Sequence, residues 1–424
     1  MKRIILYLAV FSFLLAGCGF SADDSWSSSP GGGGSNGSSS GSDGGEGSFG
    51  GDGPDEGGNG GQERPIPGQL TAGEWSDIKN YDFYLGLFNI VDEPGIEESQ
   101  RRNGFSQFKN YFGFETRYMV TVNVADGALP VGDATVELFD SDQTRLFAAK
   151  TDARGNAYLY PSYDLDGENI TVKVSSGTYE SLHPFVYSRD NLRITLDARD
   201  TAQSVLDIMF VIDTTGSMGD ELHYLKEEIS DVIGAISRDN PNYTINLALL
   251  FYRDRGDEYV TRYFEFTGDI AEQQRNLSRQ SANGGGDFPE AVDRALAEAV
   301  EKKWTAGYAT RLIFHVCDAP PHDGQENKTL FFNSVKTAAE KGIRLIPVAS
   351  SGIDLPTEYL LRQEALMTGG TYIFLTDDSG VGESHLAPTV GEYTVEYLNA
   401  CMVRVVNEYL TGIETDPVPY TGAR

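Results

Sequence analysis

Asp213, Thr215 and Ser217 place one carboxylate and two hydroxyls at alternate positions, directly after an apolar run that ends at Asp213. These oxygens suit a hard divalent cation such as Mg²⁺, which takes oxygen ligands at about 2.0–2.1 Å. Because hydroxyls are neutral, a cation held by them keeps enough charge to attract an outside carboxylate. The alternative is that the three side chains only satisfy backbone groups in a turn. We favour a site for Mg²⁺, with Mn²⁺ or Ca²⁺ as possible replacements.

Two further acidic residues follow other segments of the same kind. Asp318 ends a later apolar run, and the carboxyl ends of parallel strands meet at one edge of a sheet, so we expect Asp318 near Asp213. Asp287 lies in the glycine-rich segment Gly-Gly-Gly-Asp-Phe-Pro-Glu. It could bind the metal, or it could cap the helix expected after it. Direct binding by Asp287 would lower the affinity of the cation for an acidic partner.

These residues need a fold that brings strand ends together. From residue 205 onward, long apolar runs alternate with segments of helical periodicity. The expected strands are 206–213, 245–253, 261–266, 310–318, 343–350 and 371–375; the expected helices are 219–238, 270–279, 288–303, 328–341, 357–367 and a last one ending near residue 410. Continuous apolar runs are typical of strands that helices cover on both faces. We therefore predict a doubly wound α/β domain.

Residues 201–412 resemble a von Willebrand factor type A domain. Asp213, Thr215 and Ser217 match the Asp-x-Ser/Thr-x-Ser metal motif of that family, and Asp318 matches its distal Asp. The resemblance implies that the two hydroxyls bind Mg²⁺ or Mn²⁺ directly and that the Asp residues act directly or through water. It also implies that one metal position stays open for a carboxylate of a partner protein.

The sequence departs from the family pattern in the second loop. Members of the family usually supply a Thr there, yet no Thr lies between Gly268 and Thr305. Asp287 occupies the matching glycine-rich loop. Whether Asp287 binds metal or only caps a helix is left open at this point.

Other chemistries have less support. His315, Cys317 and His322 could be drawn as a zinc cluster, but the first two share one face of a strand and are expected to pack against a helix. A phosphatase of the haloacid dehalogenase type needs a second Asp where Thr215 stands. No Ser nucleophile motif or P-loop Lys is present, so we predict no enzyme activity.

Cys317 and Cys401 could pair in a disulfide bond, although two buried thiols are favoured.

The region before this domain has a different pattern of apolar residues. Residues 115–200 hold short alternating runs separated by turn residues, which predict an all-β sandwich. Residues 129–138 and the following 151–159 resemble transthyretin-like repeats called carboxypeptidase-regulatory-like domains, which implies a spacer without chemistry of its own. Residues 69–114 are too apolar for a linker, but their apolar residues follow no regular helical or strand spacing. We therefore assign them only as a packing segment of unclear fold. Residues 413–424 are expected to form a tail.

The amino terminus predicts export. Residues 1–17 combine two cations, a short apolar run and small residues before Cys18. Leu-Ala-Gly-Cys resembles a bacterial lipobox, so Cys18 is expected to carry the lipid. The acidic residues after it resemble lipoprotein export signals of the Bacteroidetes, or they simply begin a solvated linker. Residues 18–68 are rich in Gly, Ser and Asp, which predicts a disordered tether.

The chain of 424 residues has 33 basic and 63 acidic side chains, a formal charge of −30. Such a charge repels nucleic acid. We predict a lipid-anchored protein of the bacterial envelope, at the outer membrane and on the cell surface, that binds a protein partner through the metal. The alternative is a constitutive scaffold of an envelope complex, and a hydrolase is the least favoured class.

Overall fold

The computed structural model describes residues 65–89, 104–165, 167–197, 204–219, 221–380 and 384–422. These residues all lie in one compact unit, 62–424, and none lies in the other unit, 1–61. The predicted signal peptide, Cys18 and nearly all of the predicted tether therefore fall outside the described residues. In the part of the chain that is described, no helix is both long and apolar enough to cross a membrane.

A mixed sheet of eight strands forms the centre of this unit, in the order β12-β11-β10-β13-β14-β15-β1-β16. The strands are β1 (Thr71–Trp75), β10 (Val205–Asp213), β11 (Thr244–Tyr252), β12 (Thr261–Thr267), β13 (Thr310–Cys317), β14 (Ile343–Ala349), β15 (Tyr372–Thr376) and β16 (Glu396–Tyr397). Strands β10, β11, β13, β14 and β15 are parallel, whereas β12 and β1 run antiparallel to their neighbours. Within β10, Met209 and Val211 enter one core while Phe210 and Ile212 enter another. Both faces of the strand are therefore covered.

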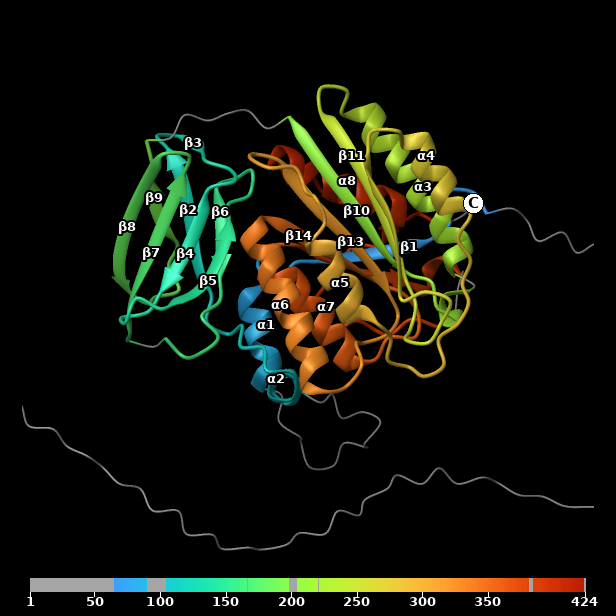
Figure 1. Ribbon diagram of the computed structural model, residues 1–424, viewed down its shortest axis with the longest axis horizontal. Coiled ribbons are helices and arrows are strands. Elements are labelled where there is room, and N and C mark those ends of the chain that lie inside the picture. Colours follow the sequence, from blue (N-terminus) through green and yellow to red (C-terminus); the bar gives the residue numbers. More distant parts are fainter. Residues whose placement is uncertain are drawn as a thin grey trace, which may run out of the picture. The chain divides into compact units, whose positions relative to one another are not determined.

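Helices lie on both faces of the sheet (Figure 1). α3 (Glu221–Asp239) and α8 (Leu398–Thr411) build one core, and α4 (Ile270–Ser278) lies beside α3. α5 (Val292–Val300), α6 (Gln325–Lys341) and α7 (Leu355–Thr368) build the other. α3 buries Leu222, Leu225, Ile229 and Val232, a stripe with helical spacing. The prediction of a C-terminal α/β domain is confirmed.

The segment 69–114 contributes to the central sheet. β1 pairs antiparallel with β15 over its full length, from Thr71 opposite Thr376 to Trp75 opposite Tyr372. After it, α1 (Tyr81–Gly86), the short η1 (Leu87–Asn89) and α2 (Phe105–Phe112) lie against α7, where the rings of Phe105 and Tyr359 are 5.2 Å apart. Figure 1 shows β1 in blue among the later strands. The five residues of β1 include Gly and Glu and show no alternation of apolar and polar side chains. Their strand conformation therefore depends on pairing with β15.

Between β1 and β10 the chain forms a separate β region of two four-stranded sheets. One holds β2 (Val120–Asp126), β3 (Leu129–Pro130), β6 (Asn156–Leu159) and β9 (Leu192–Thr195); the other holds β4 (Thr135–Phe139), β5 (Arg145–Lys150), β7 (Asn169–Ser176) and β8 (Tyr179–Val186). Val122, Val136, Leu138 and Val172 are fully buried between them. The sequence did not predict β8, an edge strand whose Pro184 and exposed side chains hide the alternation.

The β region packs against the sheet domain at the start of the parallel strands. β5 contacts α6. Arg311, at the start of β13, donates to Asp133 Oδ1 at 2.9 Å, and Arg344 of β14 donates to the carbonyl of Lys150 at 2.7 Å. We call this side of the sheet, where the parallel strands begin, the amino edge, and the opposite side, where they finish, the carboxyl edge. The candidate site lies at the carboxyl edge.

Candidate metal centre

The loop after β10 brings one carboxylate and two hydroxyls together. Asp213 ends the strand, and its Oδ1 accepts hydrogen bonds from the backbone N of Thr215 at 2.8 Å and from Thr215 Oγ1 at 2.7 Å. Ser217 Oγ lies 3.2 Å from Thr215 Oγ1. The turn η3 (Gly216–Gly219) then leads to α3. The three residues that the motif singled out thus converge at one strand end.

Asp213 is fully buried, and its second oxygen, Oδ2, has no hydrogen-bond partner among the described residues. Burial, followed by repulsion from Asp318, raises the pKa of Asp213 to about 7. A buried carboxylate oxygen without a partner is costly unless a cation compensates it. The Asp213 carboxylate and the hydroxyls of Thr215 and Ser217 form a donor set that fits Mg²⁺ or Mn²⁺. Asp318 follows β13 and is 4 % exposed, close enough to repel Asp213.

We call residues 213–217, which begin at the last residue of β10 and carry three of the predicted metal ligands, the metal loop. A glycine-rich loop at residues 283–290 lies against it. Asn283 N donates to the carbonyl of Thr214 at 3.0 Å, and Gly216 N donates to the carbonyl of Gly284 at 3.1 Å. Gly285 has φ +68°, and a Cβ there would meet Glu290 Oε1 at 2.8 Å. Glycine is needed at this position for both its conformation and its lack of a side chain.

The two loops line a cavity of about 420 Å³ together with the loops after β13 and β14. Ser217, Asp318 and Asp287 all line it. Asp287 is exposed at its rim. α5 begins only at Val292, with Ala291 at its N-cap, so the alternative role of Asp287 as a helix cap is wrong. Metal binding by Asp287 stays a prediction.

Glu290 is a residue of this cavity that the sequence did not single out. Its side chain is buried, with 3 % of the residue exposed, and its Oε2 has no hydrogen-bond partner in the described part of the chain. Burial, then repulsion from Asp213 and other acids, raises the pKa of Glu290 to about 9. The only sequence signal was an acid before a helix, which is common at helix starts and points to no site.

The residues of the possible zinc cluster do not converge. His315 Nδ1 lies 2.9 Å from Glu364 Oε2, whereas His322 Nε2 lies 2.5 Å from Asp254 Oδ1. Cys317 and Cys401 are both free, buried thiols, as favoured from the sequence. Among the described residues, no group of three or more His, Cys, Asp or Glu could hold a metal. A cation at the carboxyl edge therefore depends on hydroxyl oxygens as well as on carboxylates.

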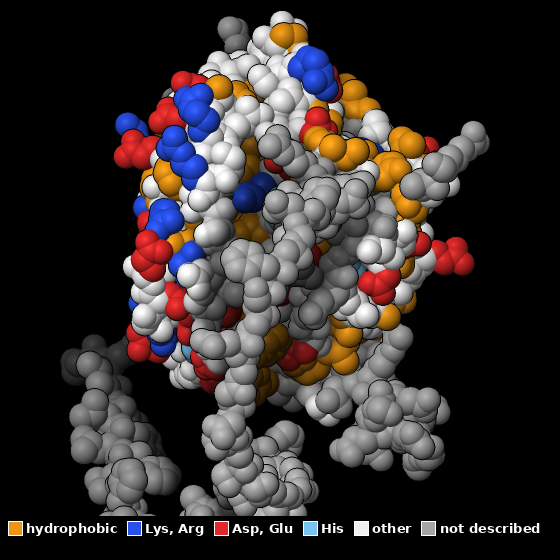
Figure 2. All heavy atoms as spheres, turned by 90° about the vertical axis from the view of Figure 1, so that its right-hand side faces the viewer, with side chains coloured by type: hydrophobic (Ala, Val, Ile, Leu, Met, Phe, Trp, Pro, Cys, Tyr) orange, Lys and Arg blue, Asp and Glu red, His pale blue; other side chains and the backbone are white. Residues whose placement is uncertain are grey.

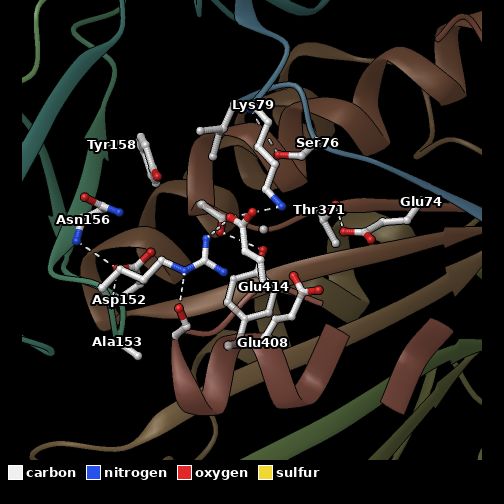
Figure 3. A pocket seen from close by; sticks show the side chains of 16 residues that line it. Glu74, Ser76, Lys79, Asp152, Ala153, Asn156, Tyr158, Thr371, Glu408 and Glu414 are labelled. Carbon is white, nitrogen blue, oxygen red and sulfur yellow. Dashed lines mark hydrogen bonds and ion pairs between the residues drawn. The ribbon is translucent and has the colours of Figure 1, made fainter. Parts of the chain in front are cut away.

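A second cavity, of about 300 Å³, lies between the β region and the sheet domain at the amino edge. Figure 3 shows Tyr158 of the β region on one side and Lys79 and Glu414 on the other. Glu414 Oε1 lies 2.5 Å from Arg154 Nη1 and 3.3 Å from Lys79 Nζ. Because these charges already satisfy one another, we place the candidate site at the carboxyl edge instead.

Positive and negative side chains are mixed on the described part of the surface that Figure 2 shows. On the face shown in Figure 2, Lys and Arg side chains lie among Asp and Glu side chains along one side, with apolar side chains spread between them. The formal charge of −30 is therefore not gathered into one acidic field on the described part of this face.

Comparison with known protein families identifies a von Willebrand factor A domain at residues 207–354. This range runs from β10 through the metal loop and the glycine-rich loop to the residues after β14. The matched range thus includes the strand-end loop that carries the sequence motif. The match covers Asp213, Thr215, Ser217 and Asp318, but it does not by itself show that they bind a metal.

Two curated relatives and one solved structure are similar to this chain. Alpha-protein kinase vwkA of Dictyostelium discoideum is 27% identical over 295 residues, which is 69% of this chain and 44% of that protein. Putative ariadne-like RING finger protein R811 of Acanthamoeba polyphaga mimivirus is 30% identical over 138 residues, 32% of this chain and 13% of that protein. The chain thus spans less than half the length of either relative.

The solved structure is the crystal structure of conserved hypothetical protein BatB from Bacteroides thetaiotaomicron. It is 16% identical with a TM-score of 0.32, and the similarity covers 43% of this chain and 91% of that one.

Proposed function

We propose that this protein binds a partner protein through a divalent cation, Mg²⁺ or Mn²⁺, at the carboxyl edge of its central sheet. The observation that carries the proposal is the buried carboxylate of Asp213: its Oδ2 lacks a hydrogen-bond partner in the described residues, while its Oδ1 accepts from the Thr215 hydroxyl, which lies 3.2 Å from that of Ser217. The adjoining cavity of about 420 Å³ gives access to a partner side chain.

In this proposal the residues of the metal loop have separate roles. Thr215 and Ser217 would hold the cation through neutral oxygens, and Asp213 and Asp318 would balance its charge, directly or through water. The cation supplies a positive charge with an open position, which an Asp or Glu of the partner can occupy. Asp213 Oδ1 keeps Thr215 in place by accepting its hydroxyl hydrogen bond. No step of this binding breaks a covalent bond, so we propose no enzyme activity.

The wider setting is part of the same proposal. Cys18 would carry a lipid that anchors the protein to the bacterial envelope, at the outer membrane and exposed on the surface, with residues 18–68 as a tether. The β region would act as a carboxypeptidase-regulatory-like spacer. We do not carry kinase activity over from the Dictyostelium relative, because this chain spans 44% of that protein.

The test uses the full chain to capture partners from envelope extract, with Mg²⁺ and with a chelator. We expect capture by the wild type to need Mg²⁺ and to be lost in Asp213→Ala. Asp378→Ala, an exposed acid just after β15, is the matched control and should capture as the wild type does. Mg²⁺ at about 100 times its Kd should also stabilise the wild type by about 2.7 kcal/mol, and Asp213→Ala not at all.

Capture that persists in chelator and in Asp213→Ala would contradict metal-dependent binding. It would favour the second candidate function, a constitutive scaffold. Ion pairs between the β region and the sheet domain, such as Arg311 with Asp133, are compatible with that role because they join the two parts.

A further inference from the structure

Glu290 comes from the glycine-rich loop, where the family resemblance leads one to expect a Thr hydroxyl. Its Oε1 lies 2.8 Å from the point that a Cβ on Gly285 would occupy, and Thr215 Cβ lies 3.3 Å from the same point. Glu290 and Thr215 therefore approach each other across the space that the missing Gly285 side chain leaves open. Through this gap, the glycine-rich loop presents a carboxylate to the metal loop.

The backbone holds Glu290 in this position. Its N donates to the carbonyl of Pro320 at 2.9 Å, and Glu290 forms an isolated parallel bridge with Pro321. Both prolines belong to the loop that follows Asp318. Gly285 N in turn donates to Asp257 Oδ2 at 2.9 Å, which attaches the glycine-rich loop to the loop after β11. Glu290 is thus held between the loops that carry the predicted metal ligands.

Among the described residues, the Glu290 carboxylate is not fully hydrogen-bonded. Glu290 is 3 % exposed, lines the same cavity as Ser217 and Asp318, and its Oε2 has no hydrogen-bond partner among the described residues. Burial, then the nearby Asp213, Asp254, Asp318 and Asp257, raises the pKa of Glu290. A buried carboxylate among other acids costs stability, and a cation in the cavity is what would offset that cost.

We propose that Glu290 holds the cation from the glycine-rich loop, in place of the Thr of the family, and that Asp287 is dispensable for this. The inference rests on the proposed function, because it assigns one more residue to the same site. Asp287 lines the cavity but is exposed, so water can solvate its carboxylate without a metal. The two acids, three positions apart, differ mainly in burial, and burial decides which of them needs the cation.

The test measures Mn²⁺ binding to the full chain by the EPR signal of free Mn²⁺, in the wild type, Glu290→Gln, Glu290→Asp, Asp287→Asn and Asp213→Ala. We expect Glu290→Gln to weaken Mn²⁺ binding by about tenfold or more, the usual size of an effect on a supporting ligand. Glu290→Asp keeps the charge and should retain part of the affinity. Asp287→Asn, the matched control, should bind as the wild type does.

Thermal unfolding without metal separates this role from a purely structural one. If Glu290 serves the cation, Glu290→Gln keeps its shape and leaves the metal-free Tm at or above that of the wild type. A lowered Tm together with unchanged Mn²⁺ affinity would make Glu290 structural and overturn the inference. An equal loss of affinity in Asp287→Asn would also overturn it.

The outcomes distinguish the inference from the proposed function. If the wild type binds no Mn²⁺, both fail. If the wild type binds Mn²⁺, Asp213→Ala does not, and Glu290→Gln binds as tightly as the wild type, then only the assignment of Glu290 fails.

Discussion

The two edges of the central sheet treat buried charge in opposite ways. At the amino edge, Arg311 is buried and paired: its guanidinium reaches Asp133 at 2.9 Å and the carbonyl of Thr305 at 2.8 Å. At the carboxyl edge, Asp213 and Glu290 are as deeply buried, yet each has one oxygen without a hydrogen-bond partner in the described chain. Arg311 at the amino edge is thus fully paired, whereas Asp213 and Glu290 at the carboxyl edge are only partly paired among the described residues.

This difference indicates where binding energy is available. A satisfied ion pair gains little from a ligand, because a new contact must replace one that already exists. An unsatisfied buried carboxylate gains from any cation that reaches it. The amino edge therefore attaches the β region. The carboxyl edge is the one where a bound cation would gain most from the buried carboxylates.

The largest effect is expected at the amino edge. Arg311→Met removes a guanidinium that is 4 % exposed and leaves Asp133 and nearby carbonyls short of a donor. The free energy of unfolding should fall by about 3 kcal/mol, measured by urea denaturation. Arg145→Met is the control, because Arg145 pairs with Glu340 at 2.9 Å across the same boundary but is largely exposed. Its loss should stay below about 1 kcal/mol. Equal losses would mean that burial does not distinguish these pairs.

A smaller effect is expected in the glycine-rich loop. Gly285→Ala forces a side chain into φ +68° and against Glu290 Oε1, so it should cost about 1–2 kcal/mol of stability and weaken Mn²⁺ binding. Gly286→Ala is the neighbouring control, since a Cβ there meets nothing within 4 Å. Thermal melts and Mn²⁺ titration of both variants provide the comparison. If the two variants behave alike, close contact between the loops is not what shapes the carboxyl edge.

The smallest effect concerns a charge at the carboxyl edge that does have partners. His385 Nδ1 lies 2.7 Å from Asp377 Oδ1, and Nε2 lies 3.2 Å from Glu221 Oε1. Burial lowers the pKa of His385, but Glu221 and Asp377 outweigh it and raise the pKa above the usual 6.5. The folded protein therefore holds this proton more tightly than the unfolded chain. The resulting stability is complete below pH 6.5 and is lost as pH rises through the raised pKa.

His385→Gln should accordingly be less stable than the wild type by up to about 1 kcal/mol at pH 6, with the gap closing at higher pH. Urea denaturation between pH 5.5 and pH 9 in chelator measures it. A gap that stays constant over this range would show that the contacts of His385 are independent of its charge.

The alternation of strands and helices after residue 205 was predictable because each element carries its own signal. β10 and β13 are continuous apolar runs, and α3 has a stripe at helical spacing. The metal loop was predictable for a similar reason, since Asp213, Thr215 and Ser217 lie within five residues of one another. Local interactions define both features.

β1 and Glu290 could not be predicted, because their roles depend on distant parts of the chain. Thr71 donates to the carbonyl of Thr376, a separation of 305 residues, and nothing in the sequence around β1 indicates that pairing. Glu290 resembles any acid before a helix until the loop folds it against Thr215. The helix-cap alternative for Asp287 was wrong because α5 begins five residues later, at Val292.

By itself the sequence determined the class of fold, the position of the metal loop and the excess of acidic charge, since periodicity and short motifs are local properties. Only the tertiary structure decided which acids lose their contact with water. Asp213 and Glu290 are buried without full partners, whereas Asp287 stays solvated. The cost of a charge depends on its solvation and its neighbours, and folding sets both.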